Sequence, residues 1–411
     1  MNLTMLKGKN IIVIGLQSWD INIGSNCKNI AEELAKNNKV IYVNVPLDRK
    51  HYLKWTFNIP ELRRLSVLRG KTSGLVSIKE NLWSFYPRIV LESINFIKDK
   101  TIFNYFNKIN SNRLAKEIIR ITKELNFDNF ILFNDSSMFR GAYMKKKLKP
   151  ELSIYYIRDN LITQDYFKKH GPRVEKKTII QADIVVSNSP YLRDYAKEYN
   201  PYSYYVGQGC DLTLFKQSEI GEPADLSTIK RPKIGYVGYL TQNRLNINLL
   251  IAIAKNKPEW QIVLVGPEDE GFKISELHQL NNVHFLGGKN GDELPAYIQY
   301  FDVCINPQAI NDLTIGNYPR KIDEYLAMGK PTVATKTATM EIFKDFVYLG
   351  ETVSDYIRLI DMALIEDSES KRQDRIDFAK NHTWENNVNQ INKAIETFYV
   401  KTGINKNYND V

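Results

Sequence analysis

A lysine and a glutamate one helical turn apart, Lys321 and Glu324, have the types and spacing that best suit an organic anion bearing hydroxyl groups. They lie in residues 311–331, NDLTIGNYPRKIDEYLAMGKP, which predict a polar loop and then a helix that starts near Pro319 and stops before Gly329. A helix N-terminus attracts anions such as a diphosphate. Lys321 adds a full charge, and Glu324 can accept hydrogen bonds from two hydroxyls. The alternative is a solvated helix face on which the two side chains pair.

A second set of residues could serve the same anion. Gly235 and Gly238 flank the end of an expected strand at 233–239, and a missing Cβ lets a phosphate approach the backbone closely. Arg244 is expected to open the next helix. If Arg244 and Lys321 converge, they can neutralise a leaving diphosphate without a metal ion.

The remaining reactive side chains exclude several classes of protein. The three cysteines lie far apart without a CxxC pair, and the five histidines have no metal-ligand spacing, so we expect no disulfide framework and no zinc site. The apolar run IIVIGL near the N-terminus is too short for a signal peptide, and no run is long enough to span a membrane. A reducing cytoplasm is the expected compartment.

Charge is divided unevenly along the 411 residues. Residues 1–200 hold 34 Lys and Arg against 19 Asp and Glu, whereas the whole chain holds 56 against 47. A basic first half suits an anionic membrane face or a phosphorylated substrate, or is simply a solvated lysine-rich surface. Aromatic and basic residues also mix in residues 51–112, which fits either lipid headgroups or ordinary aromatic packing.

Buried apolar runs that alternate with helical patterns predict an α/β fold with two Rossmann-like domains. We expect a first domain over 1–212, a second over 213–382 and a helix over 383–411 that packs back on the first. The predicted strands are 10–16, 39–45, 129–133, 153–157, 183–187, 233–239, 261–266, 283–286, 301–305 and 332–334.

Polar residues follow the predicted strands of the first domain, where ligands of parallel sheets bind. They are Trp19 and Gly24 in the first long loop, Asp135 after the third strand and Asp159 after the fourth. Asp159 could act as a general base toward a hydroxyl within about 3 Å. The alternative is a helix cap or an ion pair with Arg158.

Four segments of the second half resemble the donor-binding domain of GT-B glycosyltransferases of the family 4-like type, such as those of bacterial teichuronic acid and exopolysaccharide assembly. They are IGYVGYLTQNRLNINLL, WQIVLVGP, LNNVHFLGGKNGDELPAYIQYFDVCINP and NDLTIGNYPRKIDEYLAMGKPTVAT, in order over 232–336. Weaker matches, such as YYIRDN and ADIVVSNSPYL, extend the resemblance over most of the chain.

The resemblance implies transfer of a sugar from a nucleotide-diphosphate sugar, held between the domains, to an acceptor bound by the first domain. Glu324 would then bind the ribose, and Arg244 and Lys321 the diphosphate, with Gly238 and Gly266 close to the phosphates. Such enzymes are retaining and independent of metals and cofactors. The acceptor side would include Trp19, Gly24, Asp135 and Asp159.

One position departs from the commoner family pattern. The glutamate that precedes Glu324 by eight positions is replaced by Gly316. Contacts to the donor sugar are therefore expected from Asn311, Thr314 or Asn317.

The expected protein is a cytoplasmic glycosyltransferase, peripheral at the inner membrane face, that acts on a polysaccharide or lipid-linked acceptor and binds no nucleic acid. A nucleotide-sugar epimerase of the same fold and a non-catalytic sugar-nucleotide scaffold are the alternatives.

Overall fold

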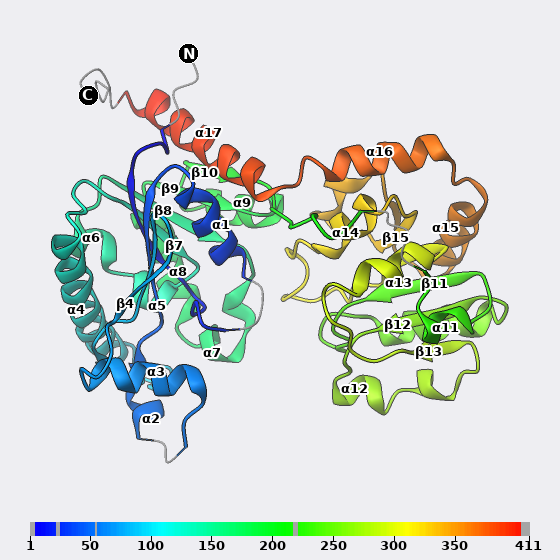
Figure 1. The fold of residues 1–411 in the computed structure, drawn as a ribbon, viewed down its shortest axis with the longest axis horizontal. Coiled ribbons are helices and arrows are strands. Elements are labelled where there is room, and N and C mark those ends of the chain that lie inside the picture. The colour runs from blue at the N-terminus through cyan, green and yellow to red at the C-terminus, as the bar shows by residue number, and fades with distance from the viewer. Residues whose placement is uncertain (1–4, 22–24, 54–55, 217–220, 404–411) are drawn as a thin grey trace. The chain divides into compact units, whose positions relative to one another are not determined.

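The computed structural model describes residues 5–21, 25–53, 56–216 and 221–403. The chain divides into two compact units (Figure 1). Unit 1 comprises Met1–Gly207 and Trp384–Val411, and unit 2 comprises Gln208–Thr383. Each unit is an α/β structure with its own sheet, so the predicted pair of Rossmann-like domains is confirmed.

Unit 1 is built on a sheet that is parallel except at one edge, where β4 pairs antiparallel with β5. Its central strands are continuous apolar runs because helices cover both faces of the sheet. A separate pair, β3 (Leu47–Asp48) and β6 (Val90–Leu91), lies outside it. In sheet order the strands are β10 (Ser203–Tyr205), β9 (Ile184–Ser187), β8 (Leu152–Ile157), β7 (Ile131–Asp135), β1 (Asn10–Ile14), β2 (Lys39–Val43), β5 (Leu82–Phe85) and β4 (Leu75–Lys79).

Alternate side chains of the unit 1 strands enter two different cores. One core joins the sheet to α1 and α17, and the opposite core joins it to α4. The last helix therefore packs on unit 1, as the sequence predicts. The helices are α1 (Asn26–Ala35), α2 (Arg49–Tyr52), α3 (Ile59–Leu68), α4 (Lys100–Glu124), α5 (Met138–Gly141), α6 (Met144–Leu148), α7 (Asp165–Lys168), α8 (Gly171–Gln181), α9 (Pro190–Lys197) and α17 (Trp384–Thr402).

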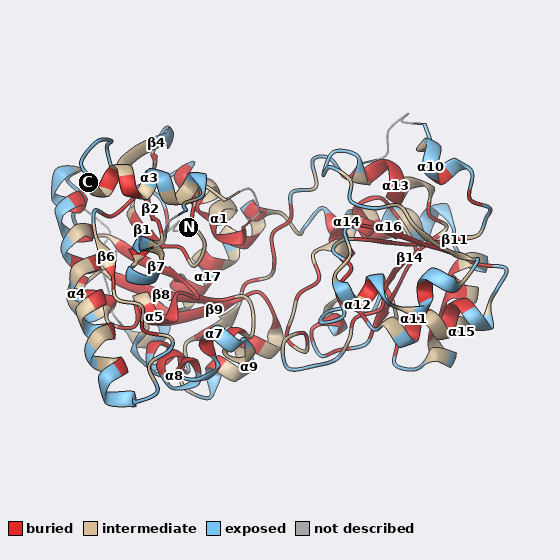
Figure 2. Cartoon of the chain, turned by 90° about the horizontal axis from the view of Figure 1, so that it is seen from below, coloured by how far each residue is buried: buried red, intermediate tan, exposed pale blue. Residues whose placement is uncertain are grey.

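Unit 2 has a fully parallel sheet in the order β13-β12-β11-β14-β15-β16. Relative to the chain this is 3-2-1-4-5-6, the order of a Rossmann fold, and it reverses between β11 and β14. Figure 2 shows the strands as the most buried part of the unit. The strands are β11 (Lys233–Val237), β12 (Gln261–Val265), β13 (Val283–Phe285), β14 (Val303–Asn306), β15 (Thr332–Thr335) and β16 (Tyr348–Gly350).

Helices also cover both faces of the unit 2 sheet. One core contains side chains of α13 and α14, and the other contains side chains of α11 and α15. Among the described residues, no helix of either unit is long and apolar enough to cross a membrane. The helices of unit 2 are α10 (Ala224–Ser227), α11 (Ile247–Asn256), α12 (Glu270–Lys273), α13 (Leu294–Tyr300), α14 (Lys321–Ala327), α15 (Val353–Ile365) and α16 (Glu369–Ala379).

Candidate functional site

The loops that follow β11 and β14 diverge where the strand order of unit 2 reverses, which is the usual ligand-binding position of such a sheet. Backbone hydrogen bonds tie the two loops together. Asn246 N–H donates to the carbonyl of Pro307 at 2.8 Å, and Ala309 N–H donates to that of Arg244 at 2.9 Å. The two loops, which carry predicted donor-binding residues, are therefore held in fixed positions relative to each other.

Gly238 directly follows β11 and has φ +140°, a backbone conformation that L side chains rarely adopt. A Cβ at this position would lie 2.9 Å from Lys321 Nζ. Gly266, with φ +154°, has a different role, because its Cβ would lie 1.9 Å from the carbonyl oxygen of Gly238. Gly266 thus permits close packing of two backbones, and Gly238 leaves space beside an ammonium group.

Lys321 is the first residue of α14, and its ammonium lies at the end of β11. Nζ donates a hydrogen bond to the hydroxyl of Tyr236 and lies 4.1 Å from the centroid of that ring. Tyr236 is buried in the sheet and thereby fixes the position of the cation. Lys321 and Gly238 are thus brought together as predicted, although α14 begins two residues after Pro319.

Glu324 lies one turn along α14 and is half-buried. Burial raises the pKa of its carboxyl group, an effect that the charges of Arg320 and Lys321 oppose. Within the described part of the chain, its carboxylate accepts no hydrogen bond. Its oxygens are therefore available for hydroxyl groups of a ligand.

Asp323, the neighbour of Glu324, is instead fully buried and contacts polar groups of two other side chains. One carboxylate oxygen lies 2.5 Å from Nδ1 of His382 and accepts a hydrogen bond from Tyr318 Oη at 3.1 Å. These contacts fix the rotation of α14 about its axis. At the other end Gly329 closes the helix in a left-handed conformation, with Lys330 N–H donating to the carbonyl of Tyr325 at 2.9 Å.

The three residues predicted to contact a donor sugar differ in availability. Thr314 is fully buried, and its hydroxyl donates to the carbonyl of Ala309, so it shapes the loop rather than facing a ligand. Asn311 is exposed but also supports the loop, because its carboxamide accepts from Leu313 N–H at 3.0 Å and donates to the Asn243 carbonyl at 3.0 Å. Asn317 is half-buried.

Two expectations for the β11 region are wrong. Arg244 does not open a helix: α11 begins at Ile247 and is capped by Asn246, whose side chain accepts from Leu249 N–H at 3.0 Å. Arg244 is an exposed loop residue. Gly235 does not leave space for a phosphate, since a Cβ there would lie 2.0 Å from the ring of Phe301.

The residues predicted for the acceptor side of unit 1 are mostly structural in this fold. Asp135 is fully buried and forms an ion pair with Arg158 Nε at 3.0 Å. Asp159 is half-buried and lies 3.6 Å from Nη1 of the same arginine. The backbone N–H of Trp19 donates to the side chain of Asn44 at 2.7 Å. Gly24 lies outside the described residues.

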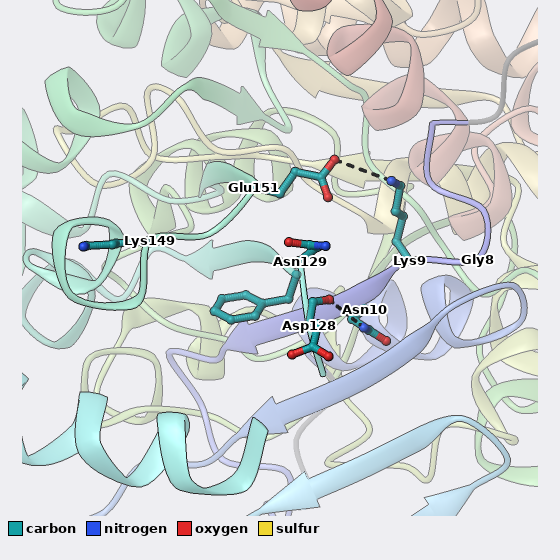
Figure 3. A pocket seen from close by; sticks show the side chains of 8 residues that line it. Gly8, Lys9, Asn10, Asp128, Asn129, Lys149 and Glu151 are labelled. Atoms are coloured by element: carbon teal, nitrogen blue, oxygen red, sulfur yellow. Dashed lines mark hydrogen bonds and ion pairs between the residues drawn. The ribbon is translucent and has the colours of Figure 1, made fainter. Parts of the chain in front are cut away.

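A polar pocket of about 540 Å³ opens at the amino ends of β1, β7 and β8 (Figure 3). Its charged groups include Lys9 and Glu151, which lie 3.5 Å apart, while Lys149 points away from both. Asn10 donates to the backbone carbonyl of Asp128 at 2.8 Å. These contacts join polar groups of the pocket to one another, and the pocket lies at the edge of the sheet opposite to the usual ligand site. We therefore assign it no function.

Comparison with solved structures defines the class of fold. Sucrose-phosphate synthase of Thermosynechococcus elongatus superposes with a TM-score of 0.66 at 13% identity, covering 96% of this chain and 100% of that chain. Trehalose 6-phosphate synthase of Burkholderia multivorans gives 0.67 at 10% identity, covering 96% and 100%. HepE of Anabaena in complex with UDP gives 0.62 at 16% identity, covering 95% and 100%. The chain therefore has the fold of GT-B glycosyltransferases.

The sequence comparisons are more specific. Residues 231–356 match the family described as Glycosyl transferases group 1, and this range includes every predicted donor residue. A Bacillus subtilis (strain 168) protein assigned as a teichuronic acid biosynthesis glycosyltransferase, TuaH, is 26% identical over 250 residues, which are 57% of this chain and 62% of that protein. Residues 231–356 of unit 2 therefore resemble a group 1 glycosyltransferase domain, and the predicted resemblance is confirmed.

Proposed function

We propose that this protein is a glycosyltransferase that moves a sugar from a nucleotide-diphosphate sugar to a polysaccharide or lipid-linked acceptor. The observation that carries the proposal is that Lys321 Nζ lies beside Gly238, where the unit 2 sheet reverses its strand order, with Glu324 one turn along the same helix. The match of the same residues to a group 1 glycosyltransferase domain supports it.

In the proposed donor complex the diphosphate lies beside Gly238 and is held by Lys321, with the exposed Arg244 as a second cation. Glu324 accepts hydrogen bonds from the ribose hydroxyls, which suits a carboxylate without a protein partner among the described residues. The complexes of HepE with UDP, with UDP and glucose, and with UDP-glucose support a uridine nucleotide as the first donor to test.

The proposed chemistry is departure of the nucleoside diphosphate, with its developing charge stabilised by Lys321 and Arg244. Fixed cations aimed at a developing negative charge lower the barrier because they need little rearrangement during the reaction. We propose a retaining, metal-independent reaction in which Asp159 accepts the acceptor's proton. Asn317 and Asn311 are the proposed contacts to the donor sugar.

We further propose that unit 1 binds the acceptor at the cytoplasmic face of a membrane. Its helix α3 presents Ile59 and Leu62 with 83% and 52% of their surface exposed, next to the exposed Arg63. Apolar and cationic side chains together suit an anionic lipid surface. Flotation with anionic and with zwitterionic vesicles measures this preference, and equal recovery with both contradicts it.

Nucleotide binding and turnover test the donor site. We expect Lys321→Ala and Glu324→Ala each to weaken UDP binding or lower turnover at least tenfold, about 1.4 kcal/mol, because each removes a direct ligand contact. Isothermal titration with UDP and release of nucleoside diphosphate from UDP- and GDP-sugars are the measurements.

The matched controls are Lys255→Ala and Glu276→Ala, which remove the partners of an exposed ion pair of unit 2. We expect both to retain wild-type binding, since exposed ion pairs contribute little. Folded Lys321 and Glu324 variants that bind and turn over as the wild type does would contradict the proposed site.

A further inference from the structure

A pocket of about 280 Å³ lies within unit 1 at the carboxyl ends of its central strands. Leu16 follows β1, Val45 follows β2, and residues 137–140 follow β7. This is the edge of the sheet at which parallel α/β structures bind ligands. The pocket could not be predicted from the sequence, because its lining comes from segments that are far apart in the chain.

Arg140 is the cation of this pocket. It is half-buried, and its Nη2 donates to the backbone carbonyls of Gly15 and Leu16, both at 3.0 Å. No carboxylate of a described residue lies within 4 Å of its guanidinium group, since the nearby Asp135 pairs with Arg158. Burial lowers the pKa of Arg140. A desolvated cation without a counter-ion is costly, and an anionic ligand would offset that cost.

Two further polar side chains of the lining are almost fully buried. Ser137 and Asn107 are each 2% exposed. Among the described residues, the hydroxyl oxygen of Ser137 is buried without a hydrogen bond, and Asn107 lines the same pocket. Asn110, by contrast, is satisfied by both backbone polar groups of Glu92 at 2.7 and 2.9 Å. A buried hydroxyl without a hydrogen bond is uncommon, and that of Ser137 lines the pocket that holds Arg140.

The rest of the lining is largely apolar and aromatic, and it includes Leu91, Ile94, Met138, Phe139 and Phe167. Such walls suit an apolar or ring-shaped portion of a ligand.

The pocket also contains a carboxylate, that of Asp48. It accepts the backbone N–H of His51 at 2.9 Å and lies 2.8 Å from that residue's Nδ1. A ligand with two anionic ends would be repelled here, so a single anionic group is favoured.

We propose that this pocket binds a molecule with one anionic group, a phosphate or a carboxylate, attached to an apolar or ring-shaped portion, and that Arg140 holds the anionic group while Asn107 and Ser137 hydrogen-bond to it. The inference rests on the proposed function in one respect: the bound molecule is part of the acceptor. The volume admits one small ring with its anionic substituent and not a longer glycan.

The test uses phenyl phosphate and benzoate as anionic probes and phenol as the neutral probe, each titrated into the full-length protein by saturation-transfer NMR. Saturating UDP, or a Lys321→Ala background, prevents binding of phosphate at the proposed donor site. We expect phenyl phosphate to bind at millimolar concentration and more tightly than phenol. Arg140→Gln should weaken binding of the anionic probes at least tenfold and change the affinity for phenol by less than twofold. Tighter binding of phenyl phosphate than of benzoate would indicate a phosphorylated ligand, and the opposite order would indicate a carboxylated one.

The matched control is Arg193→Gln, which removes a half-buried arginine of unit 1 that pairs with Asp194 at 2.8 Å. It should bind the probes as the wild type does. If Arg140→Gln does not fold, Arg140→Lys and Asn107→Ala take its place, and each should weaken phenyl phosphate by several-fold. Equal binding of phenol and phenyl phosphate, no binding of phenyl phosphate, or unchanged binding by the folded variants would overturn the proposal. Failure of the proposed donor site would appear separately, as loss of UDP binding by the wild type.

Discussion

The two units share a sheet plan but differ at the residue that follows the first strand of each. In unit 1 this residue is Gly15, and the space of its missing Cβ is filled by the ring of Tyr42, whose hydroxyl would lie 2.1 Å from a Cβ. In unit 2 it is Gly238, and the corresponding neighbour is the ammonium of Lys321 at 2.9 Å. The missing Cβ therefore serves packing in one unit and leaves space beside a charged group in the other.

The surroundings of the two glycines extend this difference. Beside Gly15, burial raises the pKa of both Cys27 and Tyr42 well above their ordinary values, so both remain protonated in the core of unit 1. Beside Gly238 lies Lys321, and Glu324, one turn along the same helix, is half-buried without a hydrogen bond among the described residues. The strand order alone therefore does not identify a binding site. The chemistry of the side chains at the point where the order reverses does identify it.

The largest expected effect would come from breaking the buried ion pair of unit 1. Asp135→Ala removes the nearer of the two carboxylates beside the largely buried Arg158, and breaking such an ion pair typically costs about 3–5 kcal/mol. Urea unfolding should show this loss, while UDP binding by the folded fraction should be unchanged. Asp194→Ala is the control, because it removes an exposed partner of Arg193 and should cost less than about 1 kcal/mol. Equal losses for the two variants would contradict a structural role of Asp135.

A second prediction compares the buried carboxylates of the two units. Burial raises the pKa of Glu175 in unit 1 to about 7, although the hydroxyls of Tyr155 and Tyr195 donate to it at 3.0 and 3.3 Å. Burial also raises the pKa of Asp323 in unit 2, but His382 opposes the shift. Burial therefore raises the pKa of both carboxyl groups, and the two differ in what opposes the shift: tyrosine hydroxyls for Glu175 and chiefly His382 for Asp323.

Because the folded-state pKa of Glu175 exceeds its unfolded value near 4.5, the folded protein binds more protons between these values. Its contribution to stability is full below pH 4.5 and is lost as pH rises through about 7, by about 3 kcal/mol at roughly 1.4 kcal/mol per pKa unit. Glu175→Gln should lack this loss in urea unfolding at pH 5 and pH 8. The exposed Glu198→Gln should keep the wild-type profile. A Glu175→Gln profile parallel to that of the wild type would show that the carboxyl group titrates normally.

The smallest expected effect separates the two glycines themselves. Gly15→Ala should destabilise the protein by about 1–3 kcal/mol, the usual cost of overpacking, and leave UDP affinity unchanged. Gly238→Ala should weaken UDP binding several-fold, because its Cβ displaces Lys321. Gly291→Ala, at a position with no atom within 4 Å of the added Cβ, serves as the control for both. If Gly15→Ala lost affinity for UDP while Gly238→Ala bound UDP as the wild type does, the roles assigned to the two glycines would be wrong.

Most of the sheet could be read from the sequence because its strands are long apolar runs. The predicted strands at 39–45 and 261–266 correspond to β2 and β12, with ends shifted by at most two residues. The three-residue strands β10 and β16 were missed, whereas β13, which is equally short, was predicted at 283–286. The region of residues 51–112 was also poorly predicted, because its aromatic residues divide between core and surface.

The sequence by itself determined the two α/β units and the loop and helix of residues 311–331. It also determined that Lys321 and Glu324 lie one turn apart on one helix, because spacing along a helix is a local property. Only the tertiary structure decided which glycine faces a cation, that Thr314 and Asp135 are engaged internally, and that Arg140 lines a pocket without a counter-ion. Those outcomes depend on contacts between segments distant in the chain. Periodicity and motif spacing record only which residues share an element, whereas packing decides which elements meet.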